Sequence, residues 1–198
     1  MKYLAVSVFW IGYCFLHSYL ISISFTKYIT HLLKNYYAFY RLFYVSISLV
    51  LLIPLINYTN QIDRVILISY VSPWHVIRYI FMYGSLLLFF WAFFFNYDPL
   101  SFFGIRQILN LKKSKEKNSV AEIKQNGLLG IVRHPMYLAL IIYLWTQTFR
   151  VVDIIVNIIL TIYVIIGTIL EEKKLMIEFG DAYKNYQKQV PMLIPFTK

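Results

Sequence analysis

Two groups of ionisable side chains stand at the ends of neighbouring apolar segments. Arg133, His134 and Tyr137 open one segment, and Glu171-Glu172 close the next. Charge is costly next to hydrocarbon, so ionisable residues kept there usually serve a function. Pro135 suits the first turn of a helix, where N–H groups and the helix dipole favour an anion, and the two carboxylates favour a cation. Together they would suit a zwitterionic ligand, although an Arg-His pair at a helix entry can also be a simple interfacial anchor.

Five apolar segments must position these residues, at 3–25, 42–56, 79–97, 136–149 and 154–170. Hydrophobic residues make up 60% of the 198-residue chain, and uncharged runs reach the ~18 residues typical of a membrane span. We therefore predict an all-α, polytopic membrane bundle of about five transmembrane helices. The fourth is the shortest and covers only about 21 Å, so its Arg-His-Pro start should lie recessed near the headgroups.

The distribution of basic residues predicts the orientation. With five spans, 15 of the 19 Lys and Arg residues fall on one face, which the positive-inside rule makes cytoplasmic. We expect the N-terminus outside, with the C-terminus and the Arg133 and Glu171 site inside. The net charge of +10 then reflects topology and attraction to anionic lipid, with an acidic ligand as the alternative, and no pattern indicates nucleic-acid binding.

We predict one domain over 1–198 with three parts. These are three spans in 1–97, a cytoplasmic interfacial segment in 98–130, and in 131–198 the hairpin of the last two spans, which carries the candidate site, with the tail that follows it. Residues 62–73 are too short and broken to cross and should form an outer loop. Residues 100–111 mix apolar and polar side chains in a pattern suited to one interfacial helix.

A cytoplasmic amphipathic helix is predicted after Glu172. Its apolar face would comprise Leu175, Phe179, Tyr183, Tyr186 and Val190. The helix could be an anchor packed on the bundle or a cover over a site. Pro191 and Pro195 end helical continuation and should turn the tail back towards the membrane.

The remaining candidate residues have plain interpretations. Cys14 is the only cysteine and should be a core residue, so neither a disulfide framework nor a metal site is expected. His17 falls within the first span, where a core histidine is a more common role than one near an acceptor. Arg41 and Arg78 at span entrances suit interfacial anchors.

These motifs carry a family resemblance. Arg133-His134-Pro135-x-Tyr137, Glu171-Glu172 and the run from Phe179-Gly180 to Val190-Pro191 resemble the C-terminal half of the isoprenylcysteine carboxyl methyltransferase and phospholipid methyltransferase superfamily. Weaker matches in the first half are similar to the branch with methanethiol S-methyltransferases and nitric-oxide-reduction-associated membrane proteins: Trp10, His17-Ser18, Tyr40-Arg41-Leu42 and Phe103-Gly104-Ile105-Arg106-Gln107.

The resemblance implies a membrane enzyme that uses S-adenosyl-L-methionine at the cytoplasmic end of the hairpin. Three residues would act in catalysis: Arg133 orients a carboxylate of substrate or cofactor, Glu171 binds the cofactor's amino group or ribose, and Tyr137 lines the methyl-transfer site. The implied cofactor-binding residues are Ile123, Lys124, Leu129, His134, Pro135, Met136, Tyr137, Glu171 and Glu172.

Two departures from the family pattern bear on the ligands. Leu129 stands where the family often has Tyr, which argues against an aromatic contact to adenine there. Gly167 stands where carboxyl-methylating relatives carry Arg, which disfavours a prenylcysteine carboxylate. The acceptor expected is small and apolar or membrane-partitioned. A thiol is one candidate, and Arg133 or Arg106 could stabilise its thiolate. Isoprenylcysteine carboxyl or phospholipid amine methylation is the alternative, and a non-enzymatic protein linked to nitrogen-oxide metabolism is the alternative of another class.

Overall fold

The computed structural model describes residues 1–63, 65–110 and 125–197, and all the regular elements in them are helices. Four are long and apolar enough to cross a membrane, spanning Lys2–Leu20, Tyr36–Ile62, Trp74–Asn96 and Val151–Phe179, and the apolar helix Pro135–Trp145 is shorter. Many of their large apolar side chains are exposed, as Phe15 is at 71% and Leu87 at 73%, which is costly in water and suits contact with lipid. The predicted all-α, multi-pass membrane fold is confirmed.

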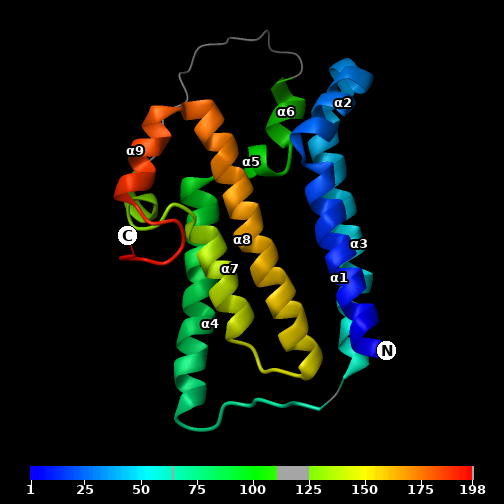
Figure 1. Cartoon of the computed structure of the whole chain (residues 1–198), viewed down its shortest axis with the longest axis vertical. Helices are drawn as coiled ribbons and strands as arrows, with labels where there is room; N and C mark the ends of the chain where they lie inside the picture. Colours follow the sequence, from blue (N-terminus) through cyan, green and yellow to red (C-terminus); the bar gives the residue numbers. More distant parts are fainter. Residues whose placement is uncertain (64, 111–124, 198) are drawn as a thin grey trace. The chain divides into compact units, whose positions relative to one another are not determined.

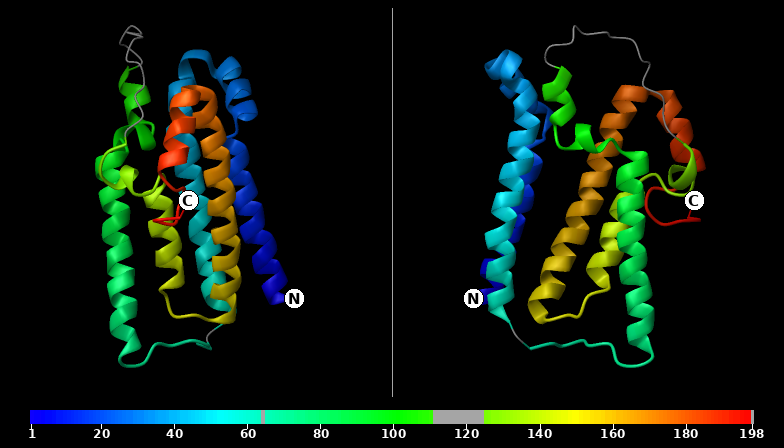
Figure 2. Two further views of the ribbon diagram at one scale, coloured as in Figure 1. Left: turned by 60° about the vertical axis from the view of Figure 1, so that its left-hand side comes forward. Right: turned by 180° about the vertical axis from the view of Figure 1, so that it is seen from behind.

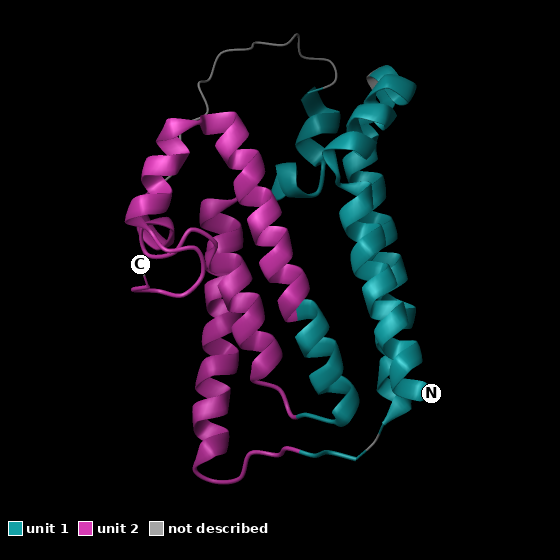
Figure 3. Ribbon diagram, in the orientation of Figure 1, with its two compact units in different colours: residues 1–67, 99–117, 149–160 teal, residues 68–98, 118–148, 161–198 magenta. Residues whose placement is uncertain are grey.

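The described chain divides into two compact units (Figure 3). Unit 1 comprises residues 1–67, 99–117 and 149–160, and unit 2 comprises 68–98, 118–148 and 161–198. Helix α8 (Val151–Phe179) contributes its first turns to unit 1 and the rest to unit 2.

Unit 1 is built on the antiparallel pair α1 (Lys2–Leu20) and α3 (Tyr40–Ile62), which lie side by side in Figure 1. Trp10 Nε1 donates to Thr59 Oγ1 at 3.0 Å, a bond that satisfies both polar groups inside the apolar core. Helix α2 (Ile23–Leu33) and the 3-10 helix η1 (Lys34–Phe39) connect the pair. The core between α1, α3 and the start of α8 contains Val6, Trp10, Leu55, Val152 and Val156.

Unit 2 holds both ends of the predicted hairpin. Helix α4 (Trp74–Trp91), extended by the π-helix η2 (Ala92–Asn96), packs against α7 (Pro135–Trp145), and both views of Figure 2 show the two side by side. The 3-10 helix η4 (Gly127–Gly130) precedes α7, and α9 (Asp181–Gln189) follows α8. Helix α7 has only 11 residues, against 18 in its partner α4.

Two helix predictions were wrong in the same way. The single interfacial helix expected over 100–111 is two short helices in its described part, α5 (Pro99–Phe102) and α6 (Ile105–Leu109), separated by Gly104 at φ 82°. The amphipathic helix expected after Glu172 is the end of α8 followed by α9, separated by Gly180 at φ 56°. Glycine readily adopts positive φ and so ends a helix where the apolar spacing alone would continue it.

Several span limits also differ from the prediction. The first span ends at Leu20, and Ser22 caps α2 by accepting from the Phe25 N–H at 3.3 Å. Helix α8 extends past the predicted 154–170 at both ends. Cys14 is buried at 6% exposure, as predicted.

Candidate functional site

The turn before α7 is held by the C-terminal tail. Pro135 occupies the first position of α7 and His134 caps it. The Arg133 N–H donates to Pro191 O at 2.9 Å and the His134 N–H to Met192 O at 3.1 Å. The tail thus returns to the start of the hairpin, and its carbonyls fix the direction in which the Arg133 and His134 side chains leave the backbone.

Glu172 is the centre of a buried polar cluster. Its Oε1 accepts from Arg133 Nε at 2.6 Å and lies 3.2 Å from His134 Nε2, and its Oε2 accepts from Gln187 Nε2 at 2.9 Å. The Tyr183 hydroxyl donates to Oε1 at 3.4 Å. Glu172 is only 8% exposed, and a buried carboxylate is tolerated when it is paired and hydrogen-bonded in this way.

Arg133 also binds the end of α9. Its Nη1 donates to Gln187 O at 3.2 Å and to Val190 O. A cation at a helix C-terminus satisfies carbonyls that lack partners in the helix and is favoured by the dipole. We expected Arg133 to face a ligand carboxylate, whereas the structure directs its Nε and Nη1 to Glu172 and α9.

Glu171 has a different environment from its neighbour. The Tyr137 hydroxyl donates to Glu171 Oε2 at 2.7 Å, and the Tyr137 ring stacks on the His134 ring with centroids 5.6 Å apart. Among the described residues this is the only hydrogen-bond partner of the Glu171 carboxylate, which is half-buried. A carboxylate can accept several more bonds, so Glu171 retains capacity for a cationic or hydroxyl-bearing ligand.

His134 offers a second group with spare capacity. The residue is 2% exposed, and its Nδ1 is buried with no hydrogen-bond partner in the described part of the chain. Such atoms are rare in folded proteins and often mark a functional position. Pro135 and Met136 are buried next to it and form the packed base of the turn.

The upstream segment reaches the site through Leu129. Its carbonyl accepts from the Tyr186 hydroxyl at 2.5 Å, which ties η4 to α9. Burial raises the pKa of Tyr186 to about 12, although the positive charge of Arg133 acts to lower it. The hydroxyl therefore remains protonated and a donor at neutral pH. Ile123 and Lys124 lie outside the described residues.

Two residues near the site were not predicted. Gln187 lies on the same face of α9 as Tyr183 and Val190. Its spacing of four and three residues from them could have indicated in the sequence that it faces the site. Tyr97 follows η2, and burial together with the negative charge of Glu171 raises its pKa. No run of polar residues marks Tyr97 in the sequence.

Every described residue of the predicted hairpin site therefore gathers in unit 2. Arg106 belongs to unit 1. Within the described residues, no group of three or more His, Cys, Asp and Glu side chains could hold a metal ion.

Comparison with known proteins identifies relatives of one kind. The chain is 31% identical over 141 residues to a methanethiol S-methyltransferase of Crocosphaera subtropica, covering 71% of this chain and 50% of the relative. It is 41% identical over 95 residues to the enzyme of that name from Pseudomonas deceptionensis, covering 47% and 36% of the two chains. Methanethiol S-methyltransferase 1 of Bradyrhizobium diazoefficiens is 34% identical over 116 residues, covering 58% and 40%.

These matches confirm the predicted resemblance to the methanethiol S-methyltransferase branch. The chain spans about half the length of the first relative and less of the other two. No protein-family model matches the chain. No solved structure matches it significantly.

Proposed function

We propose that this protein is a membrane methyltransferase that transfers a methyl group from S-adenosylmethionine to a small thiol. The observation that carries the proposal is the Tyr137–Glu171 pair beside His134, where residues of the cofactor-binding turn meet the carboxylate pair in one partly buried cluster. Relatives named for methyl transfer to methanethiol support the reaction and the acceptor class.

The donor set fits the proposed cofactor. S-adenosylmethionine carries an amino group, a carboxylate, a ribose and a sulfonium-bound methyl group that is already activated for transfer. Glu171 would accept from the amino group or ribose, His134 Nδ1 offers an unpartnered polar atom, and the first turn of α7 presents N–H groups to a carboxylate. Met136, Leu129, Ile123 and Lys124 would complete the cofactor pocket.

Arg133 and Glu172 are better suited to positioning than to ligand contact. Their ion pair joins the loop before α7 to α8, and the further bonds of Arg133 hold α9 over the same end of the hairpin. The α9 segment then covers the site, which was one of the two roles considered for it. Tyr137 lines the methyl-transfer position, with its hydroxyl fixed by Glu171.

The acceptor is inferred from what the site lacks. Gly167, one helical turn before the Glu pair, has no side chain and so supplies no cation that could pair with a substrate carboxylate. A buried carboxylate without a partner is unfavourable. A small thiol that loses its proton to solvent and takes up the methyl group through sulfur needs alignment and exclusion of water more than a charged partner.

The orientation follows from the basic residues. We propose that the N-terminus is outside and that the C-terminus and the site are cytoplasmic, where S-adenosylmethionine would reach it from water and an apolar acceptor from the bilayer.

Radiolabelled methyl transfer by the purified full chain in detergent tests the function. The acceptors are methanethiol, a farnesylated cysteine and phosphatidylethanolamine, offered in parallel. We expect label in methanethiol only, strongly reduced in Glu171→Gln and unchanged in Glu178→Gln, an exposed carboxylate on the same helix. Label in the farnesylated cysteine or in the lipid without label in the thiol would overturn the acceptor, and no label in any of them would overturn the activity.

A further inference from the structure

A pocket of about 310 Å³ lies in unit 2 at the end of the α4–α7 pair away from Pro135. It is formed by the first turns of α4, the loop before it and the end of α7, and it is lined by Tyr70, Trp74, Ile77, Arg78, Phe81, Trp145 and Thr146. The pocket shares no residue with the Glu171 site. Its size suits a lipid headgroup with the first part of one chain.

Arg78 is the only charged residue of the lining. Its guanidinium lies over the Tyr79 ring at 4.6 Å and the Tyr70 ring at 5.7 Å, which holds it in place without neutralising it. Its Nε is buried and has no hydrogen-bond partner among the described residues. No carboxylate in the described part of the chain lines the pocket, so the charge of the guanidinium favours an acceptor that carries negative charge.

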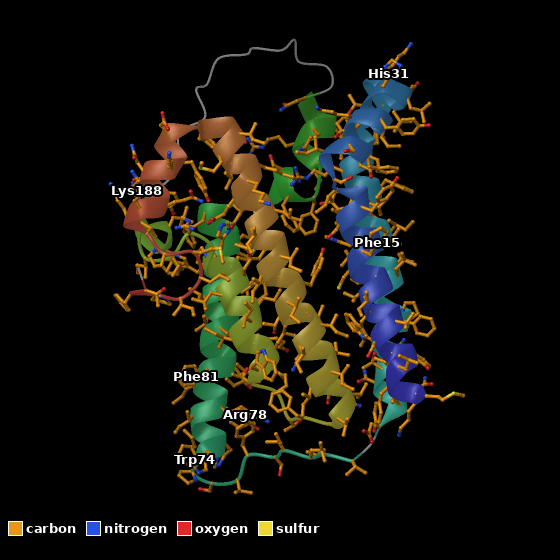
Figure 4. All side chains as sticks on the ribbon, viewed as in Figure 1. Phe15, His31, Trp74, Arg78, Phe81 and Lys188 are labelled. Carbon is orange, nitrogen blue, oxygen red and sulfur yellow. The ribbon has the colours of Figure 1, made fainter. Side chains whose placement is uncertain are left out.

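The other walls are apolar or aromatic. Trp74, Ile77, Arg78 and Phe81 follow the spacing of one helix face, and Figure 4 shows three of them along the first turns of α4. Trp74 and Phe81 are 62% and 55% exposed, so this face is open to the surroundings of the helix. An anion dissolved in water would gain nothing from these side chains.

The level of Arg78 in the membrane selects the kind of anion. The span Trp74–Asn96 has 23 residues, about 35 Å of helix, and Arg78 lies about 6 Å from its start. A hydrocarbon core of about 30 Å then begins near Arg78, with Trp74 and Trp145 at the headgroup level, where tryptophan is enriched. Phosphate groups of lipids lie at this depth.

We propose that this pocket binds one anionic phospholipid of the bilayer. Phosphate oxygens accept hydrogen bonds from Arg78, and an acyl chain runs along Ile77 and Phe81 into the hydrocarbon. Under the proposed orientation the lipid belongs to the outer leaflet. A zwitterionic lipid of the same chains binds less tightly because its choline cation opposes Arg78.

Native mass spectrometry of the full chain in detergent measures this binding, with phosphatidylglycerol and phosphatidylcholine of identical acyl chains as probes. We expect one phosphatidylglycerol bound at least tenfold more tightly than phosphatidylcholine. Arg78→Gln should remove most of this preference, and Arg78→Lys should retain part of it because the charge remains while the planar donor group is lost. Excess inorganic phosphate should not displace the lipid.

Lys188→Gln is the matched control, since Lys188 is an exposed cation on α9 in the same unit and lies outside the pocket (Figure 4). It should bind phosphatidylglycerol as the parent does. Phe81→Trp, which narrows the pocket and leaves Arg78 intact, should weaken binding at least fivefold and provides the same test if Arg78→Gln does not fold. Equal affinity for the two lipids, equal losses in Arg78→Gln and Lys188→Gln, or displacement by phosphate would each overturn the proposal.

Discussion

Neighbouring carboxylates on α8 have separate roles because adjacent residues point in different directions around a helix. Glu172 is occupied by Arg133, His134, Tyr183 and Gln187, whereas among the described residues Glu171 has only Tyr137 as a hydrogen-bond partner. Glu172 therefore stabilises the fold of the site, and Glu171 is available to a ligand. This division separates the effects expected from substituting each one.

Substitution of Glu172 should affect stability more than any exposed carboxylate does. Arg133 and Glu172 have side-chain exposures of 8% and 11%, and removing one partner of a buried pair leaves an uncompensated charge. We expect Glu172→Gln to lower the free energy of unfolding by about 3 kcal/mol. Denaturant unfolding in detergent measures it, with Glu178→Gln as the control expected within about 0.5 kcal/mol of the parent. Similar values for the two variants would show that the ion pair contributes little.

At the scale of elements, the site depends on where α8 ends. Gly180 adopts φ 56° and ψ −130°, which turns the chain from α8 into α9, and α9 then brings Tyr183, Tyr186 and Gln187 onto the start of α7. A continuous helix through this position would carry the same side chains away from Arg133. The break at Gly180 is thus required for the cover over the site.

The substitution Gly180→Ala should destabilise this turn through its effect on the backbone alone. A Cβ there meets nothing within 4 Å, but the conformation is unfavourable for other residues and costs about 1–3 kcal/mol. Gly84 in α4 is the opposite case, since a Cβ there also meets open space but the backbone is helical. Gly84→Ala should therefore raise the free energy of unfolding by up to about 1 kcal/mol. Thermal unfolding of both variants should shift in opposite directions. A shift of the same sign in both would mean that the Gly180 backbone is not strained by a side chain.

At the scale of the whole molecule, hydropathy predicted an all-α, multi-pass membrane fold because span length and apolarity are fixed by the bilayer. Of the five predicted spans, four correspond to helices long enough to cross a membrane, and the remaining one corresponds to the shorter helix Pro135–Trp145. Hydropathy also predicted that Arg133 and Glu172 meet, since a hairpin of two spans returns its ends to one face. The apolar spacing continues through Gly180, so the break there was missed. As a polar residue, Gln187 was not distinguished from solvent-exposed ones, although it donates to Glu172. The sequence also could not show that Arg133 is hydrogen-bonded to Glu172 and to the end of α9. The single domain over 1–198 stays a prediction.

The orientation of the chain predicts which loops reagents can reach. In a Cys14→Ala background, a cysteine at Gln61 in the last turn of α3 should react with an impermeant maleimide added outside intact cells, and one at Lys184 on α9 should react only after permeabilisation. Both positions are exposed, so access to the reagent decides the result. Labelling of Lys184→Cys in intact cells would contradict the cytoplasmic placement of the site.

Calorimetry with S-adenosylhomocysteine tests most directly whether Glu171 and the turn of His134 bind S-adenosylmethionine. We predict that the parent binds one equivalent and that Glu171→Gln weakens binding at least tenfold, or about 1.4 kcal/mol, while Glu178→Gln binds like the parent. The glutamine keeps the shape of Glu171 and can still accept from Tyr137, so the loss would report the ligand's contact with the charge. Undiminished affinity in Glu171→Gln, or a parent that binds no S-adenosylhomocysteine, would contradict the assignment of this site.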